Sequence, residues 1–261
     1  MIFTLCLILP LMAYADSRND ILLKQADTKV SGEYVRQQFI KLLDKPFTDN
    51  AKKKLLVIGD SHAQDFINMV VENHLLSDYQ ISTRDIPTRC QPILVDNAQQ
   101  YIAEKDKAFC EKADSLKKAK PKIAQADVII LVANWKKWSA KELPNTIKNL
   151  QLKPEQKLFI IGRKSFGKIK IRKYLRMSDQ QLRNLQNTVD GEQVAINQIM
   201  QKRLDKSQYI DFQQAVCGAI DKCRVFTSDL KLISFDGGHL TKDGAAFVGR
   251  ILFKATGLRE L

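Results

Sequence analysis

Histidine, tryptophan and closely spaced metal-binding pairs are scarce in this chain. Its 261 residues include three histidines and two tryptophans, and no Cys-x-x-Cys or His-x-x-x-His pair occurs. Because such pairs are typical of zinc sites, the sequence predicts no metal site, and we expect no cofactor. Internal repeats and low-complexity tracts are absent as well. With 44% hydrophobic and 27% charged residues, the composition indicates a globular chain and excludes a disordered or multi-span membrane protein.

The sequence also lacks a long hydrophobic run. The apolar stretch at residues 2–12 is shorter than the roughly 20 residues that a membrane-spanning helix needs. A small-x-small cleavage pattern, Ala13-Tyr14-Ala15, follows it, so residues 1–15 are predicted to be a secretory signal peptide. The segment has no Lys or Arg near its start, and the alternative is a clipped gene start that keeps the end of a membrane helix. Both interpretations predict that the remainder is periplasmic or otherwise extracytoplasmic.

Acidic residues are outnumbered by basic ones, 29 against 42, which gives a net charge of +13. Residues 1–15 contribute nothing to this charge. A basic exported protein is suited to acidic glycans or to peripheral contact with an anionic membrane surface, and the export segment argues against nucleic acid as a partner. The basic side chains are widely scattered, which also fits a solvated surface with no binding role.

Cysteine usage agrees with an oxidising compartment. Without Cys6 in the predicted signal, four cysteines remain, and an even number is compatible with two disulfides. Three connectivities exist for four cysteines. The short loop between Cys217 and Cys223 favours a bond between those two, which leaves Cys90 with Cys110. The alternative is that the four are buried free thiols.

The apolar runs predict a parallel sheet. Continuous runs alternate with helical segments, which is typical of a sheet covered on both faces. We therefore predict a three-layer α/β/α sandwich of the flavodoxin-like type with about five parallel strands, in a domain that covers residues 54–261. The strands are expected near residues 54–58, 79–84, 127–133, 157–162 and 208–212.

Helices are expected between and after these strands. The predicted segments are 63–76, a long polar helix over 99–120, and further helices near 139–150, 178–205 and 242–256. Residues 16–53 form a polar lead-in with one helix at 32–43, and residues 85–97 form a loop. In such sheets the functional site lies at the carboxyl ends of the strands, where Ser61, Asn134 and Gly162 fall.

A strand-to-helix turn at Gly59-Asp60-Ser61 carries the first chemical signal. Free backbone N–H groups at the start of a helix stabilise an oxyanion, so Ser61 is placed as a nucleophile would be. The placement alone is only suggestive, because many open α/β sheets have a small polar residue there. His62 follows directly and points elsewhere on the turn, and we assign it to substrate binding.

Near the C-terminus, Asp236 and His239 are separated by Gly237 and Gly238. The carboxylate can reach the imidazole in a tight turn and fix its tautomer, which frees the other ring nitrogen to take a proton from a hydroxyl. Alone, the pair is a weak signal, and a solvated loop is the favoured interpretation. Together with Ser61 on a parallel sheet, it indicates a Ser-His-Asp triad.

These motifs resemble the SGNH hydrolase superfamily, also called the GDSL family. The resemblance covers about residues 54–256 and is closest to the extracytoplasmic SGNH domains fused to acyltransferase-3 membrane proteins, which O-acylate bacterial surface polysaccharides. The matching segments are Gly59-Asp60-Ser61-His62, Cys90-x-Pro92, Leu131-Val132-Ala133-Asn134-Trp135 and Asp236-Gly237-Gly238-His239-Leu240-Thr241.

The resemblance implies roles for individual residues. Ser61 would attack an acyl carbonyl, His239 would act as general base and Asp236 would orient it. The Ser61 N–H and Asn134 would form the oxyanion hole. The sequence departs from the family pattern because Ala133-Asn134-Trp135 lacks the Gly and Asp of the third block, and no second-block glycine is identified. This departure puts the composition of the oxyanion hole in doubt.

Two further features bear on ligands. Trp135 and Trp138 follow the third strand and could line a sugar-binding cleft, with ordinary packing as the alternative, and we assign Trp135 to substrate binding. Residues 168–176 hold five basic side chains. They could face anionic lipid, an acidic glycan or a membrane partner, or they form a solvated face.

The sequence therefore predicts a secreted serine O-acyltransferase or acylesterase that adds or removes acetyl or other acyl groups on a cell-envelope polysaccharide. The resemblance implies a membrane acyltransferase-3 partner that supplies the acyl groups. The alternative is a non-catalytic glycan-binding or docking subunit that keeps the fold.

Overall fold

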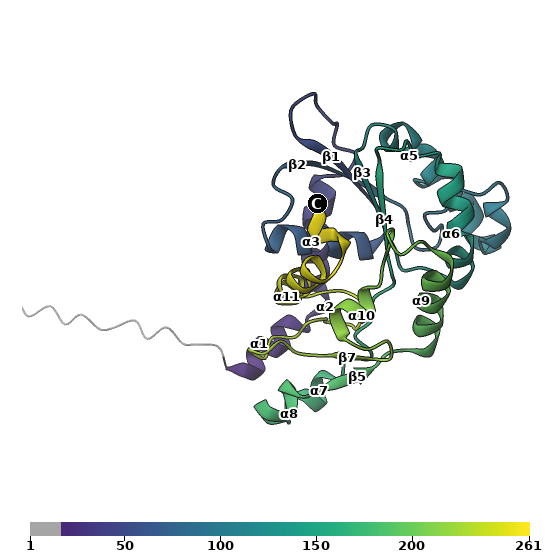
Figure 1. Cartoon of the computed structure of the whole chain (residues 1–261). Coiled ribbons are helices and arrows are strands. Elements are labelled where there is room, and N and C mark those ends of the chain that lie inside the picture. The colour runs from purple at the N-terminus through teal and green to yellow at the C-terminus, as the bar shows by residue number, and fades with distance from the viewer. Residues whose placement is uncertain (1–16) are drawn as a thin grey trace, which may run out of the picture.

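A five-stranded parallel sheet forms the centre of the protein (Figure 1). The computed structural model describes residues 17–261, so the predicted signal peptide at 1–15 lies outside the described residues. The strand order is β2-β1-β3-β4-β6, with every neighbouring pair parallel. The strands are β1 (Lys53–Gly59), β2 (Tyr79–Asp85), β3 (Val128–Val132), β4 (Lys157–Ile161) and β6 (Tyr209–Ile210).

Alternating strand side chains feed two separate cores. In β1, Leu55 and Val57 point into one core, and Leu56 and Ile58 point into the other, because successive side chains of a strand face opposite sides. The first core is closed by α2 (Thr28–Lys41), α3 (Ser61–Glu72), α10 (Phe212–Cys217) and α11 (Lys242–Ala255). The second is closed by α4 (Glu104–Lys112), α5 (Leu116–Ile123), α6 (Lys137–Leu150) and α9 (Gly191–Arg203). Figure 1 shows α3 and α11 on one side of the sheet and α5, α6 and α9 on the other, which confirms the predicted three layers.

The lead-in contains two helices where the sequence predicted one. A first helix, α1 (Arg18–Gln25), precedes α2, and Asp27 separates them. The Asp27 carboxylate accepts hydrogen bonds from the N–H groups of Lys29 and Val30, so it caps α2 and starts it earlier than predicted. Because α2 packs on α3, the lead-in is part of the folded body.

Two segments predicted as long helices are broken, and in each the break is marked by a capping side chain. The 99–120 segment becomes η1 (Ala98–Tyr101), α4 and α5, and Ser115 caps α5 by accepting from the Lys118 N–H. The 178–205 segment becomes α8 (Asp179–Arg183), a short strand β5 (Gln186–Thr188) and α9, which Asp190 caps. Strand β5 pairs antiparallel with β7 (Lys222–Arg224), and this long-range pairing explains why local helical character did not prevail.

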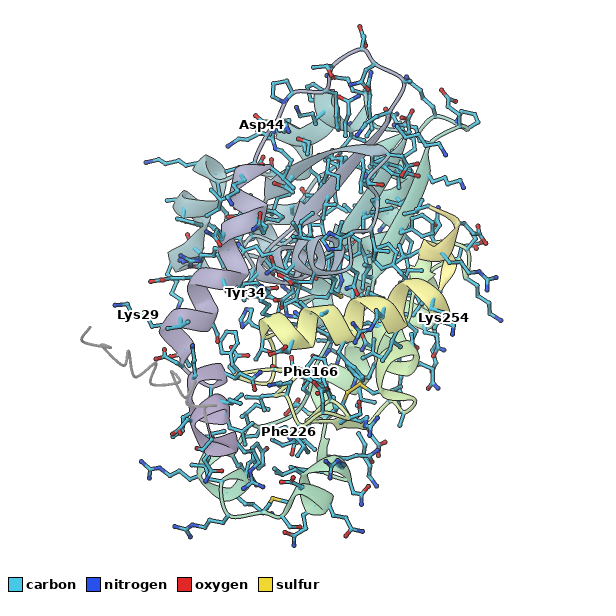
Figure 2. All side chains as sticks on the ribbon, turned by 90° about the vertical axis from the view of Figure 1, so that its left-hand side faces the viewer. Lys29, Tyr34, Asp44, Phe166, Phe226 and Lys254 are labelled. Atoms are coloured by element: carbon cyan, nitrogen blue, oxygen red, sulfur yellow. A yellow bond between two sulfur atoms is a disulfide. The ribbon has the colours of Figure 1, made fainter. Side chains whose placement is uncertain are left out.

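A small third core lies beyond the carboxyl ends of the sheet strands. It gathers apolar side chains of α1, α7 (Ile171–Tyr174), α8 and the chain after β7, namely Leu22, Tyr174, Leu182, Val225, Phe226, Leu230 and Leu232. We call residues 168–188 and 222–232 the accessory lobe; Figure 1 shows α7, α8, β5 and β7 together. Figure 2 shows Phe226 in this region, with Phe166 between it and α11.

The two disulfides have the pairing that the short loop between Cys217 and Cys223 predicted. Cys90 bonds to Cys110, and Cys217 bonds to Cys223, as predicted. The first links the loop after β2 to α4, and the second links α10 to β7. Within residues 17–261, no helix combines the length and the apolar character that crossing a membrane requires.

Candidate active site

The turn between β1 and α3 is built on a glycine that no other residue could replace. A Cβ atom on Gly59 would lie 1.7 Å from the carbonyl oxygen of Val132 on β3, well inside contact distance. The close approach of the two strands therefore requires glycine. Ser61 is the first residue of α3, so its side chain emerges at the carboxyl end of the sheet.

Asp60 holds this turn in place. Its carboxylate is buried and accepts a hydrogen bond from the His62 N–H at 3.0 Å, which caps α3. The same carboxylate accepts from the Asn134 N–H at 3.0 and 3.1 Å and from the Thr88 hydroxyl at 2.6 Å. One buried side chain thus joins the ends of β1 and β3 to the loop after β2. The sequence reasoning gave Asp60 no role, because its partners are distant in the chain.

His239 is within hydrogen-bond distance of both Ser61 and Asp236. The Nε2 atom lies 2.8 Å from Ser61 Oγ, and the Nδ1 atom lies 2.6 Å from Asp236 Oδ2. With a proton on Nδ1 donated to the carboxylate, Nε2 accepts from the Ser61 hydroxyl, which is the arrangement that activates a serine. The structure therefore brings together the three residues that the sequence placed in a triad.

The Asp236 carboxylate is organised to stay ionised. Burial opposes its charge, but hydrogen bonds from the His239 ring and from the backbone N–H groups of Gly238 and His239 outweigh burial and lower the pKa of Asp236 to about 2. Gly237 makes this turn possible: its φ is +96°, and a Cβ there would lie 2.1 Å from the Gly167 carbonyl oxygen. The turn thus supplies a permanent negative charge next to the imidazole.

A buried ion pair lies next to the triad and contacts both the Ser61 helix and the His239 loop. Asp65, one helical turn after Ser61, lies 2.8 Å from Lys164 Nζ, and both side chains are nearly inaccessible. The other Asp65 oxygen accepts from the N–H of Leu240, the residue after His239. Burial raises the pKa of Asp65, and the Lys164 charge opposes that rise. Asp65 therefore connects α3 to the His239 loop and, through Lys164, to the segment after β4.

Two donors near Ser61 have no partner among the described residues. The Ser61 N–H, at the start of α3, donates to no described acceptor, and the Asn134 side-chain amide makes no hydrogen bond to residues 17–261. Gln91 fixes the Asn134 backbone by donating to its carbonyl oxygen at 3.1 Å. The arrangement can supply an oxyanion hole from a backbone N–H and an amide. The loop at 86–97 contains no glycine that could add a third donor.

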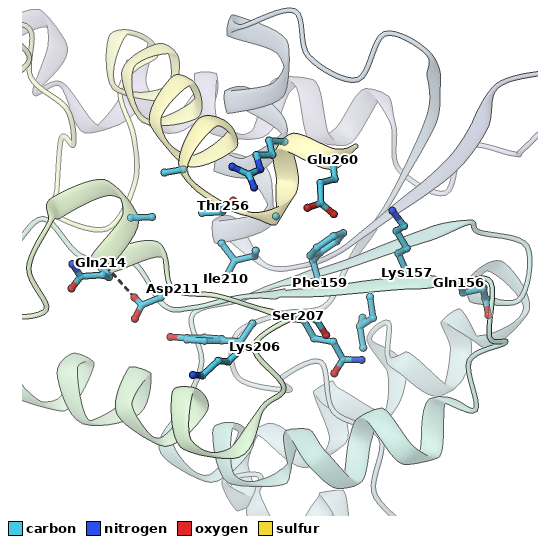
Figure 3. A pocket seen from close by; sticks show the side chains of 17 residues that line it. Gln156, Lys157, Phe159, Lys206, Ser207, Ile210, Asp211, Gln214, Thr256 and Glu260 are labelled. Atoms are coloured by element: carbon cyan, nitrogen blue, oxygen red, sulfur yellow. Dashed lines mark hydrogen bonds between the residues drawn. The ribbon is translucent and has the colours of Figure 1, made fainter.

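A cavity of about 640 Å³ opens beside these groups. Its lining includes His62, Asn134, Arg163, Asp236 and Gly237, with further residues from the 164–168 and 188–193 segments. A larger cavity of about 790 Å³ lies at the other end of β4 and contains no triad residue (Figure 3). Of these two cavities, only the smaller one borders the candidate triad, which it reaches through Asp236.

Comparison with known proteins agrees with this geometry. A family model described as an SGNH domain fused to AT3 domains matches residues 33–254. This chain belongs to that SGNH domain family. Membership places it among esterase-type and acyltransferase-type hydrolases and links it to acyltransferase-3 systems. Among curated proteins, none matches the chain.

One predicted ligand contact of this SGNH domain is wrong. Trp135 has no exposed surface, and its indole N–H donates to the Ile161 carbonyl oxygen at 2.8 Å between β3 and β4. A buried tryptophan needs a hydrogen-bond acceptor for its indole N–H, and here the backbone of β4 supplies it. Trp135 is therefore a packing residue and does not line a sugar cleft. Trp138 lies instead at the surface of α6, stacked on Tyr101 with ring centroids 5.1 Å apart.

His62 is also more buried than a ligand contact requires. It is 4% exposed, and its Nδ1 atom has no hydrogen-bond partner among the described residues. Burial, together with the nearby charges of Lys164, His239 and Arg163, holds the pKa of His62 well below its usual value, so the ring is neutral. The SGNH domain thus contains one histidine hydrogen-bonded to Ser61 and a second, buried and neutral one directly after it; substrate binding by His62 stays a prediction.

Proposed function

We propose that this protein is an extracytoplasmic serine O-acyltransferase or acylesterase that acts on a cell-envelope polysaccharide. The observation that carries the proposal is the hydrogen-bonded chain from Ser61 through His239 to Asp236 at the carboxyl end of a parallel sheet. The two disulfides and the association of the family with acyltransferase-3 proteins support the compartment and the substrate class.

The first half-reaction forms an acyl-enzyme. Ser61 Oγ attacks the carbonyl carbon of an acyl donor while its proton moves to His239 Nε2. Asp236, ionised through its own hydrogen bonds, stabilises the imidazolium that forms. The Ser61 N–H and the Asn134 amide would bind the negative oxygen of the tetrahedral intermediate. Its collapse releases the alcohol of the donor, which takes the proton from His239.

The second half-reaction consumes the acyl-enzyme. A hydroxyl group gives its proton to His239 Nε2 and attacks the Ser61 ester, and Ser61 regains a proton as it leaves. If the hydroxyl belongs to a sugar, the product is an acylated glycan, and if it belongs to water, the product is a free acid. We propose a sugar as the acceptor, with a membrane acyltransferase-3 partner as the source of acyl groups.

The acyl-enzyme can be tested directly. After exposure to an activated acetyl ester, mass spectrometry is expected to find an acetyl group on the peptide that contains Ser61. The Ser61→Ala and His239→Ala variants should not accumulate it. A His74→Gln variant is the matched control, because that histidine is exposed and lies outside both the triad and the cavity lining. Failure of the wild-type protein to form the adduct, or an adduct that persists in His239→Ala, would overturn the enzymatic proposal.

Transfer and hydrolysis are separated by their products. With an acetyl donor and an oligosaccharide acceptor, a transferase yields acetylated oligosaccharide in proportion to acceptor concentration. Free acetate alone, even at high acceptor concentration, would identify an esterase and count against transfer.

A further inference from the structure

One wall of the cavity beside the triad is basic. Arg163 and Lys168, which follow β4, line it, and Lys164 between them is paired with Asp65. The lining of the same cavity also includes Asp190 and Glu192 at the start of α9. The lining therefore holds charges of both signs, and an acidic group in the cavity is attracted to Arg163 and Lys168.

The Arg163 guanidinium is half-buried and has no carboxylate partner. Its one side-chain hydrogen bond goes to the Trp135 carbonyl oxygen at 3.3 Å, and no carboxylate oxygen of residues 17–261 lies within 4.0 Å of it. Burial lowers the pKa of Arg163, and the negative charges of Glu192, Asp190 and Asp60 only oppose this shift from a distance. A partly desolvated cation without a partner gains from binding an anion.

The backbone of Arg163 is held in place for such a role. The Asn197 side chain accepts from the Arg163 N–H at 2.9 Å and donates to its carbonyl oxygen at 2.8 Å. This double hydrogen bond anchors the backbone of Arg163 to α9, which also lines the cavity. The backbone that carries the guanidinium is therefore fixed, and the side chain is itself half-buried at the cavity.

The basic wall continues outward onto the accessory lobe. Residues 163–178 contain no Asp or Glu, and five exposed cations run outward from the cavity lining, of which Lys168 is part: Lys168, Lys170, Arg172, Lys173 and Arg176. The apolar residues between them pack in or against the third core: Tyr174 is part of it, and Ile169 and Ile171 contact it. Because these side chains turn inward, the cations are left on the surface. We call these five residues the basic ribbon.

We infer that the acceptor is an acidic polysaccharide, whose anionic groups bind Arg163 in the cavity and the basic ribbon outside it. The inference rests on the proposed function for what happens at Ser61. Continuity with the cavity favours a flexible anionic chain over a lipid bilayer, because a membrane surface does not enter a cavity beside a triad. Arg163 and the ribbon then position successive charged sugars so that a hydroxyl of one reaches the acyl-enzyme.

Binding can be measured without turnover in the Ser61→Ala protein. The probes are oligogalacturonate, neutral maltooligosaccharide of the same length, and vesicles with and without phosphatidylglycerol. We expect binding of oligogalacturonate that weakens as salt is raised, and no binding of the neutral chain. Vesicle binding without oligogalacturonate binding would overturn the inference in favour of a membrane surface.

Charge variants test which residues bind. Replacing Lys170, Arg172 and Lys173 by Gln is expected to weaken oligogalacturonate binding about tenfold, because three exposed ion pairs contribute about 0.5 kcal/mol each. Arg163→Gln should weaken it by a similar factor. The matched control replaces Lys105, Lys112 and Lys117, exposed residues on the α4 and α5 side, and removes the same net charge. The thermal unfolding midpoint of each variant, compared with that of the parent protein, verifies that the variant is folded.

The outcomes separate this inference from the proposed function. An equal loss in the control triple variant, or unchanged binding in the ribbon variant, would refute the basic ribbon as a binding site. Acetylation of Ser61 without any oligogalacturonate binding would refute the acidic acceptor and leave the enzyme standing. Selective binding that depends on Arg163 and the ribbon would support the inference even if Ser61 were never acetylated.

Discussion

At the scale of single residues, buried polar side chains position the site. Asp60 accepts hydrogen bonds from three separate segments, and Asp65 joins α3 to the His239 loop and to Lys164. Each lost partner would leave a buried donor unsatisfied, which typically costs about 1–3 kcal/mol. Precision at the triad therefore depends on carboxylates that do not themselves react.

His62 gives the protein a pH-dependent stability. Burial keeps the folded-state pKa of His62 well below its usual value, whereas in the unfolded chain it is about 6.5. Below pH 6.5 the unfolded state binds a proton that the folded state does not, so stability is full above that pH and falls as pH decreases. Between pH 7 and pH 5, protonation of this residue in the unfolded chain lowers the unfolding free energy by at most about 2 kcal/mol. Urea unfolding of wild type and His62→Gln at both pH values measures the difference.

The chain offers a control for this experiment in His74, which is exposed. His74→Gln should keep the wild-type pH dependence, whereas His62→Gln should flatten it. If both variants retain the wild-type slope between pH 7 and pH 5, then His62 is not held neutral in the folded state.

At the scale of elements, the end of β1 is fixed by how closely it approaches β3. Gly59→Ala would force a methyl group onto the Val132 carbonyl oxygen, so the strands must separate where α3 begins. We expect a loss of about 3 kcal/mol or more in unfolding free energy. Denaturant unfolding followed by circular dichroism measures it.

Gly32 provides the opposite case. It lies inside α2, and a Cβ there would meet no atom within 4 Å. Gly32→Ala should therefore stabilise the protein by about 0.5–1 kcal/mol, since alanine favours a helix. Similar effects of the two substitutions would contradict the steric explanation for Gly59.

At the scale of the whole molecule, the two disulfides restrict the unfolded chain to different extents. Cys90 and Cys110 are 20 residues apart, and Cys217 and Cys223 are 6 apart. Loop-closure entropy predicts that replacing the first pair by serine costs about 3 kcal/mol and the second about 2 kcal/mol. Thermal unfolding of each double variant, with and without reductant, measures these losses.

The quadruple serine variant controls for nonspecific effects of the reductant. Its unfolding temperature should not respond to reductant, whereas each double variant should still lose the contribution of its remaining bond. Insensitivity of the wild-type protein to reductant would contradict a stabilising role for these bonds.

Local patterns in the sequence were sufficient to predict the layers of the fold and the residues of the candidate triad. Buried strands such as β1 and β3 are continuous apolar runs, and the turn residues Gly59 and Gly237 mark where the chain must bend tightly. The pairing of the cysteines followed from one short loop. In these cases the deciding interactions lie within a few residues of each other or follow from the general topology of parallel sheets.

The remaining features were decided by contacts between distant segments. Pairing with β7 made a strand of residues 186–188, where the sequence favoured a helix. Packing between β3 and β4 buried Trp135, and the neighbours of Asp60 gave it a structural role. The sequence by itself determined which side chains form the candidate triad, because that choice depends on residue type and local turns. The tertiary structure decided which polar groups are buried and which cations line the cavity, because burial and electrostatics depend on what long-range folding brings together.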